Sequence, residues 1–91
     1  LQSIYYKTSL MKAKKITPEN QRRLEIFGMY MRELRRNQGL TQIELRKNLS
    51  TPPHRNTIIR AEAGKNISIL TAFELADALD IEIKELFEMV D

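Results

Sequence analysis

The chain has 91 residues, of which 42% are hydrophobic and 30% are charged. These values are typical of one small globular domain. The absence of Cys excludes a disulfide scaffold, a zinc–thiolate site and a thiol nucleophile. With a single His and no EF-hand-like loop or nucleophile–base set, we expect no metal, no cofactor and no enzyme activity. No apolar run approaches the roughly 20 residues of a membrane span, so we expect no membrane partner.

Charge is distributed unevenly along the chain, although the net charge is only +3. Residues 1–16 carry four Lys and no acid, and residues 17–66 carry ten basic and five acidic side chains. Residues 67–91 carry one Lys and seven acidic side chains. This split favours a basic face for a polyanion and an acidic end kept away from it. Solvated helix faces of different sign are the alternative.

Residues 1–16 form the first segment, a basic stretch without helical periodicity. We interpret it as an N-terminal arm that precedes a domain over residues 17–91. The sequence leaves open whether residues 1–10 belong to the natural chain or lie upstream of a start at Met11. It also leaves open whether they are ordered, and whether the basic cluster follows a DNA groove or serves only as a solubilising tail.

The first helix is predicted to begin at Thr17, a good N-cap, with Pro18 in the first helical position. It is expected to run to about Gln38 and to stop at Gly39. Its apolar side chains recur at helical spacing and form one stripe, made of Leu24, Phe27, Met31 and Leu34.

The second helix has a complete start signal. Thr41 and Glu44 have the spacing of a capping box, in which each side chain accepts a hydrogen bond from the other residue's backbone. Leu40 and Leu45 can pack together as a hydrophobic staple. This helix is short and is expected to end near residues 49–50.

The third helix follows the break at Pro52-Pro53 and is predicted to span about 53–62. Helical spacing places Ile58, Ala61 and the stem of Glu62 on its buried face. The side chains expected on the opposite, outward face are those of Arg55, Asn56, Ile59 and Arg60.

Two more helices are predicted, over residues 69–79 after a cap at Ser68 and over about residues 83–89. No segment shows the alternation of a strand. The sequence therefore predicts an all-α domain of five helices.

Two short helices joined by a break are typical of a helix-turn-helix. In that motif the second helix lies in the DNA major groove. Arg suits guanine, Asn suits adenine, and Ile59 could contact a thymine methyl group. The pattern alone fits an exposed polar helix equally well.

Residues 32–87 resemble the phage-repressor/Cro (XRE-type) helix-turn-helix family. The matching segments are RELRRNQGLTQIEL, TIIRAEAGKNISILTAFELADALDI and IKELF. The segment from His54 to Glu62 and the run Asn66-Ile67-Ser68 are also similar to restriction–modification controller proteins, a subset of that family. The resemblance implies a repressor-like five-helix domain.

The resemblance also implies roles for individual residues. Arg55, Asn56, Ile59 and Arg60 would face base edges. Gln42, Arg36, Lys65 and Asn66 would contact DNA phosphates. Arg35 would pair with Glu62 as a structural salt bridge, with a plain phosphate contact as the alternative for Arg35.

The sequence departs from the family pattern in the turn between the two short helices. That turn holds roughly two extra residues in the Ser-Thr-Pro-Pro stretch, and Arg46 stands where the family favours Ala. Both changes bear on the angle of the third helix.

We therefore predict a sequence-specific regulator that binds double-stranded DNA as a homodimer and associates with the nucleoid when bound. The expected location is the cytoplasm of a bacterial or phage-type system. Its expected dimer interface is made of Leu86, Phe87, Met89 and Val90. Two alternatives are an antitoxin, with a toxin as protein partner, and a protein-interaction module that kept the fold without binding DNA.

Overall fold

The computed structural model describes residues 15–49 and 56–91. The described elements are α2 (Pro18–Asn37), α3 (Gln42–Lys47), α4 (Thr57–Glu62), α5 (Ile69–Ala78) and α6 (Ile83–Leu86). All are helices, so the predicted all-α fold class is confirmed. The expectations for residues 1–14, for the double proline and for the extra residues of the turn lie outside the described residues.

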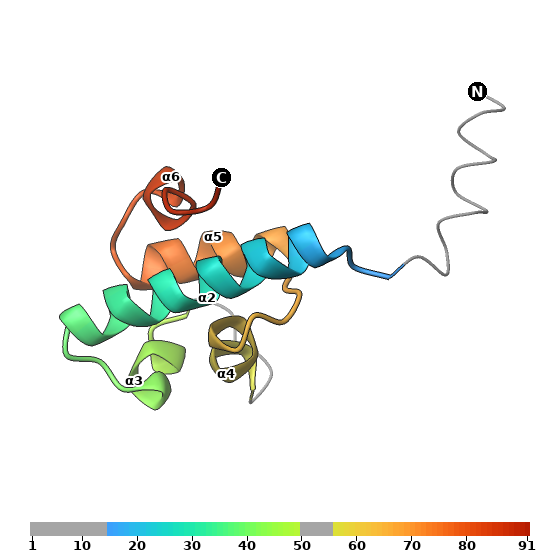
Figure 1. Ribbon diagram of the computed structural model, residues 1–91. Coiled ribbons are helices and arrows are strands. Elements are labelled where there is room, and N and C mark those ends of the chain that lie inside the picture. Colours follow the sequence, from blue (N-terminus) through green and yellow to red (C-terminus); the bar gives the residue numbers. More distant parts are fainter. Residues whose placement is uncertain (1–14, 50–55) are drawn as a thin grey trace, which may run out of the picture.

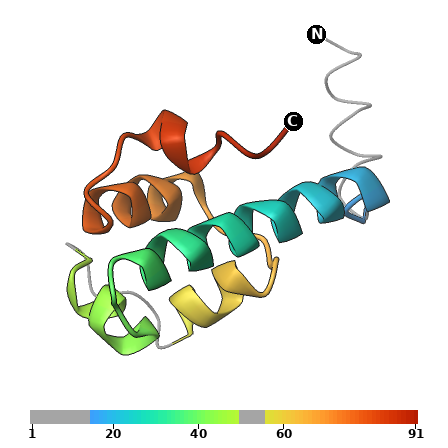
Figure 2. The same cartoon turned by 60° about the vertical axis from the view of Figure 1, so that its left-hand side comes forward.

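The long helix α2 is the centre of the architecture. It separates α3 and α4 on one side from α5 and α6 on the other (Figures 1 and 2). Helix α4 packs against both α2 and α3, and α6 packs against both α2 and α5. One core joins the two sides, and its fully buried large side chains are Met31, Leu45, Ile58, Leu75, Leu79 and Leu86.

Helix α2 begins and ends as the sequence predicts. The side chain of Thr17 accepts a hydrogen bond from the backbone N–H of Asn20 at 3.2 Å, and Pro18 opens the helix. Gly39 follows the helix with a φ of 73°, a left-handed conformation that favours glycine. The backbone N–H of Leu40 then donates to the carbonyl oxygen of Arg35, which turns the chain into α3.

The capping box of α3 is also confirmed. The backbone N–H of Glu44 donates to Thr41 Oγ1 at 3.1 Å, and the backbone N–H of Thr41 donates to Glu44 Oε1 at 2.8 Å. The hydrogen bond from the Thr41 backbone holds the pKa of the Glu44 carboxyl below its usual value. A carboxylate with a lowered pKa stabilises the folded state at neutral pH, and this contribution is lost as the pH falls through that pKa. The cap therefore stabilises the start of α3 under ordinary conditions.

Three predicted helix boundaries are wrong. Helix α3 ends at Lys47 instead of near residues 49–50, with Asn48 as its C-cap. Helix α4 begins at Thr57 instead of near residue 53, because the carbonyl oxygen of Asn56 accepts the first helical hydrogen bond, from the backbone N–H of Arg60 at 2.8 Å. Helix α6 ends at Leu86 instead of residue 89, because the chain continues from Phe87 as turns.

At Gly28 the backbones of α2 and α4 lie in direct contact, and the sequence patterns did not single this residue out. A Cβ atom at this position would lie 2.4 Å from the carbonyl oxygen of Ala61 and 2.9 Å from that of Glu62. Both atoms belong to the backbone and cannot rotate away. Only a residue without a side chain therefore allows the two helices this separation.

We predict that Gly28→Ala lowers the free energy of unfolding by about 1–3 kcal/mol, because α2 and α4 must move apart. The better helix propensity of Ala, about 1 kcal/mol, acts in the opposite direction, so a net loss shows that the steric clash dominates. Urea denaturation measures the change. Met29→Ala is the matched control because Met29 is the next residue and is exposed, so its change should stay within about 0.5 kcal/mol. Equal stability of the two variants would contradict the proposed clash.

Candidate nucleic-acid interface

Helix α4 has one face in the core and one face in solvent. Ile58 and Ala61 are almost completely buried, whereas Ile59 is 50% exposed and Arg60 is also exposed. This division agrees with the faces predicted for the third helix. Burial of one side fixes the rotation of α4 about its axis, so that Ile59 and Arg60 project away from the protein.

The two other residues expected on the outward face of the helix are Asn56 and Arg55. Asn56 is exposed but lies in the turn before α4, with φ −102° and ψ 11°, and its side chain makes no capping hydrogen bond. It was expected inside the helix, and that expectation is wrong. Arg55 lies outside the described residues. The described part of α4 therefore presents fewer polar side chains than the sequence indicated.

A buried ion pair joins α2 to α4. Arg35 Nε lies 2.5 Å from Glu62 Oε2, and Arg35 Nη2 donates to Glu62 Oε1 at 2.9 Å. The two side chains are only 8% and 5% exposed. Two parallel hydrogen bonds to one carboxylate are the strongest geometry available to a guanidinium group. The pair fixes how the end of α4 meets α2.

The same pair extends to the chain between α2 and α3 and to the first residue of α3. Arg35 Nη1 donates to the carbonyl oxygen of Leu40 at 2.7 Å, and Gln42 Nε2 donates to Glu62 Oε1 at 3.0 Å. The hydrogen bond to Glu62 raises the pKa of Arg35 further, so the guanidinium stays charged throughout the usable pH range. One buried charged cluster thus positions all three helices.

Gln42 was assigned to a DNA phosphate, and its amide nitrogen faces the protein. A side-chain amide has two N–H donors, and Glu62 takes one of them. The side chain is half-buried. Gln42 therefore positions Glu62 in the described structure, and at most its second N–H is left for a phosphate.

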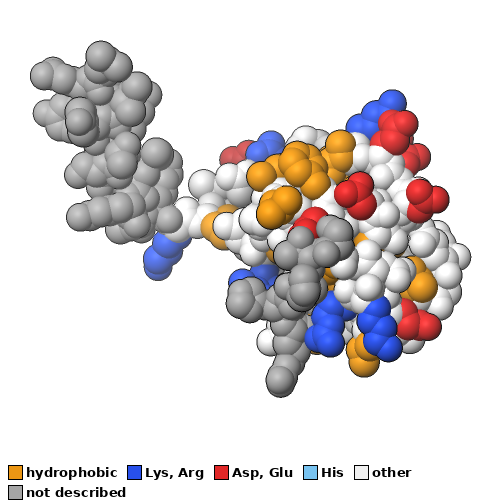
Figure 3. Space-filling model, turned by 180° about the vertical axis from the view of Figure 1, so that it is seen from behind, with side chains coloured by type: hydrophobic (Ala, Val, Ile, Leu, Met, Phe, Trp, Pro, Cys, Tyr) orange, Lys and Arg blue, Asp and Glu red, His pale blue; other side chains and the backbone are white. Residues whose placement is uncertain are grey.

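Cationic and polar side chains surround the outward face of α4. Arg36, Lys65 and Asn66 are all exposed. Lys65 and Asn66 directly follow Gly64, which ends α4 with a φ of 78°. Figure 3 shows Lys and Arg side chains along the lower side of the molecule, where α3 and α4 lie, and most visible Asp and Glu side chains higher up. The arrangement presents positive charge around the outward face of α4.

The structure buries part of the surface that the sequence predicted as a dimer interface. Leu86 is completely buried in the core of its own chain, so it cannot contact a second copy. Phe87 is partly covered because its ring packs against Phe27, with 5.2 Å between the ring centroids. Val90 is half-buried, and Met89 is well exposed. Only part of the predicted surface is available to a partner.

Helix α5 carries exposed apolar side chains that the sequence reasoning missed. Leu70 is 59% exposed and Phe73 is 47% exposed, while Ala72, Leu75 and Ala76 on the other side are buried. The sequence could have predicted these exposed residues. A helix with one buried face needs only one apolar stripe, and α5 has further apolar residues outside that stripe.

Two negative findings concern the described residues alone. Within 15–49 and 56–91, no group of three or more His, Cys, Asp or Glu side chains could hold a metal ion. None of the described helices combines the length and apolar content needed to cross a membrane.

We predict that Glu62→Ala lowers the free energy of unfolding by about 3–5 kcal/mol, because it leaves the Arg35 guanidinium buried without its partner. The double variant Arg35→Met with Glu62→Leu should recover most of this loss, since it removes both charges. Asp91→Asn is the control, because it removes only the exposed ion pairs with Arg22 and Arg23 and should cost no more than about 1 kcal/mol. Urea denaturation of the variants measures these differences, and a loss at Glu62 no larger than at Asp91 would contradict the structural role.

The geometry of α3 and α4 agrees with the comparison of this chain with known families. A family model described as helix-turn-helix matches residues 31–86. No curated protein and no solved structure matches the chain. The matched segment contains α3, α4, α5 and α6 and the buried cluster of Arg35, Gln42 and Glu62. The chain belongs to the helix-turn-helix family of the phage-repressor (XRE) type, a family of DNA-binding regulators.

Proposed function

We propose that this chain recognises a specific double-stranded DNA sequence by placing the outward face of α4 in the major groove. The observation that carries the proposal is the orientation of α4. Its inner face is held by the core and its end by the ion pair with Arg35, so Ile59 and Arg60 project outward in one fixed direction. A preorganised helix loses little entropy on binding, which favours specific contacts.

The proposed base contacts use the chemistry of the outward side chains. Arg60 offers a guanidinium to the O6 and N7 acceptors of a guanine, and Ile59 offers an apolar contact to a thymine methyl group. Asn56 and Arg55, which precede α4, are proposed as further base contacts. An Asn side chain fits the N6 and N7 atoms of adenine.

The proposed phosphate contacts come from residues around this helix. Lys65, Asn66 and Arg36 are exposed and can reach backbone oxygens beside the groove. Gln42 is proposed to add its second amide N–H while it holds Glu62. These contacts would position the protein and make its affinity depend on salt.

We propose that the chain binds DNA as a homodimer, because one small module has too little interface for high specificity. Two copies would place their α4 helices roughly 34 Å apart, one turn of DNA, on a palindromic site. The exposed apolar residues Leu70 and Phe73 on α5, with Met89, support an interface on the side of α2 opposite to α3 and α4. No specific observation on the described residues favours the antitoxin or the interaction module.

We predict that Arg60→Ala weakens binding to a selected palindromic duplex by about 1–3 kcal/mol and relaxes the base preference at one position of each half-site. Lys65→Ala should weaken binding to all sequences alike and reduce the slope of log affinity against log salt by about one. Band-shift titrations on selected and random duplexes separate these effects.

The control is Lys84→Ala, which removes one positive charge from α6, away from α4. It should leave both affinity and preference nearly unchanged. The wild-type chain should prefer its selected duplex over random DNA by about 10³-fold or more. Equal binding to both kinds of duplex would contradict sequence-specific recognition.

We predict that Phe73→Ser shifts the chain towards the monomer, since it removes an apolar side chain from the proposed interface. Sedimentation equilibrium over a range of protein concentrations measures the shift. Ile43→Ser is the matched control because Ile43 is similarly exposed but lies on α3, so it should leave the dimer intact. A wild-type chain that is monomeric both in solution and on its DNA site would rule out the homodimer.

A further inference from the structure

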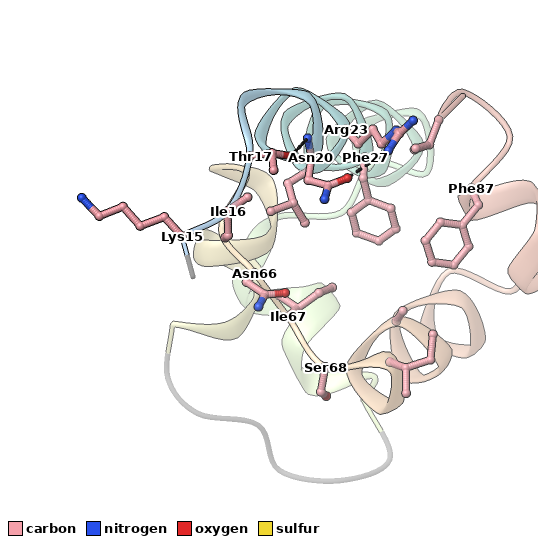
Figure 4. A pocket seen from close by; sticks show the side chains of 14 residues that line it. Lys15, Ile16, Thr17, Asn20, Arg23, Phe27, Asn66, Ile67, Ser68 and Phe87 are labelled. Carbon is pink, nitrogen blue, oxygen red and sulfur yellow. Dashed lines mark hydrogen bonds between the residues drawn. The ribbon is translucent and has the colours of Figure 1, made fainter. Parts of the chain in front are cut away.

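A mostly apolar cavity of about 670 Å³ lies beside the start of α2, and its lining includes Asn66, which also borders the outward face of α4. Its walls come from the start of α2, the connection between α4 and α5, the start of α5 and the chain after α6. Phe27 and Phe87 face each other at one end, and Lys15 points away from the other end (Figure 4). This volume lies within the range of about 300–1,000 Å³ that ligand-sized sites have, so the cavity can hold several side chains.

The lining of this cavity is more apolar than an exposed surface requires. Ile16 and Ile69 are both exposed, although each is a large apolar side chain at the edge of the cavity. Ile67 and Val90 are only half-buried, and they complete the apolar lining. A concave, mostly apolar site of this volume is a candidate binding site.

The chain itself supplies a segment at the mouth of this cavity. Lys15 and Ile16 belong to the lining, so the residues that precede them start at the cavity. Fourteen residues precede Lys15, and an extended chain advances roughly 3.3–3.6 Å per residue, so the segment is long enough to cross it. The segment also holds the apolar side chains that a filled cavity needs, namely Ile4, Tyr5, Tyr6, Leu10 and Met11.

Charge has to be considered for the same occupant, because the charged side chains of the cavity lining are the cationic Lys15 and Arg23. Residues 1–14 contain three Lys and no acid. The far end of the cavity, beside Phe87 and Val90, belongs to the stretch 67–91, which has seven acidic side chains and one Lys. Glu88 and Asp91 are exposed in that stretch. Asp91 already pairs with Arg22 at 3.5 Å and with Arg23 at 4.0 Å, so the apolar side chains of the segment, and not its lysines, would provide the binding free energy.

We propose that residues 4–11 dock into this cavity in the same chain, with Tyr5 and Tyr6 supplying most of the buried apolar surface. Two aromatic rings bury more area than any other pair of residues in the segment and can pack against Phe27 and Phe87. Docking would place the lysines of the segment near the acidic end of the domain. It would also keep them from following a DNA groove.

Paramagnetic relaxation enhancement in the full chain tests this proposal. The sequence contains no Cys, so Ser3→Cys gives a single site for a nitroxide label. We expect a loss of methyl NMR signal for Ile67, Ile69 and Val90, which line the cavity. We expect no loss for Ile43, which lies on α3 and away from the cavity. Unchanged methyl signals at these three cavity residues would overturn the proposal.

Variants separate docking from simple proximity to the start of α2. Tyr5→Ser with Tyr6→Ser should restore the signals of the cavity methyl groups, whereas Gln2→Ser, in the same segment, should not. Ile69→Lys should also restore the Ile67 and Val90 signals, because it replaces an apolar side chain of the lining with a charged one. Ile69 is exposed, so the fold should tolerate the change, and an unchanged Ile43 signal would show this. Signal loss that persists in both tyrosine and Ile69 variants would overturn the proposal.

A mixed sample identifies the source of the docked segment. Nitroxide-labelled chains without isotope labels are mixed with methyl-labelled chains that lack the nitroxide. Docking within one chain predicts no signal loss in this mixture and a clear loss when both labels are on the same chain. A loss at the cavity methyl groups in the mixture would assign the occupant to a second copy and would overturn docking within the chain.

Discussion

The buried ion pair between Arg35 and Glu62 is the contact on which the arrangement of α2, α3 and α4 depends. Its guanidinium also holds the carbonyl oxygen of Leu40, and its carboxylate accepts from Gln42. A buried charge without a partner is far more costly than an exposed one, so few other arrangements of these helices are acceptable. The main effect of the ion pair is therefore to fix the orientation of α4 relative to α2 and α3.

Close packing at Gly28 acts together with this ion pair. The missing side chain lets α2 approach the last residues of α4, where the carbonyl oxygens of Ala61 and Glu62 lie. This short separation brings Glu62 within reach of Arg35, which lies two helical turns further along α2. Sterics and electrostatics thus constrain the same helix end, and α4 has little freedom to rotate when it meets a partner.

Helix α2 divides the protein into two sides with different chemistry. On the side of α3 and α4, the exposed side chains of Arg36, Arg60 and Lys65 place positive charge around one projecting helix, which suits a polyanion. On the other side, α5 and the cavity next to Phe87 present exposed apolar side chains, and the stretch 67–91 carries seven acidic side chains. The second side therefore suits contacts with protein better than contacts with a DNA backbone.

The sequence by itself determined the features that depend on neighbours along the chain. Caps such as Thr41 with Glu44, the stop at Gly39 and the two faces of the third helix follow from spacing alone, because helical periodicity and hydrogen-bonding geometry are local. Only the tertiary structure decided what depends on packing between helices. Leu86 is buried although the pattern placed it outside, Gly28 is a contact point, and Gln42 turns towards Glu62. The physical reason is that burial and pairing depend on which segments approach one another in space, and no local spacing records that approach.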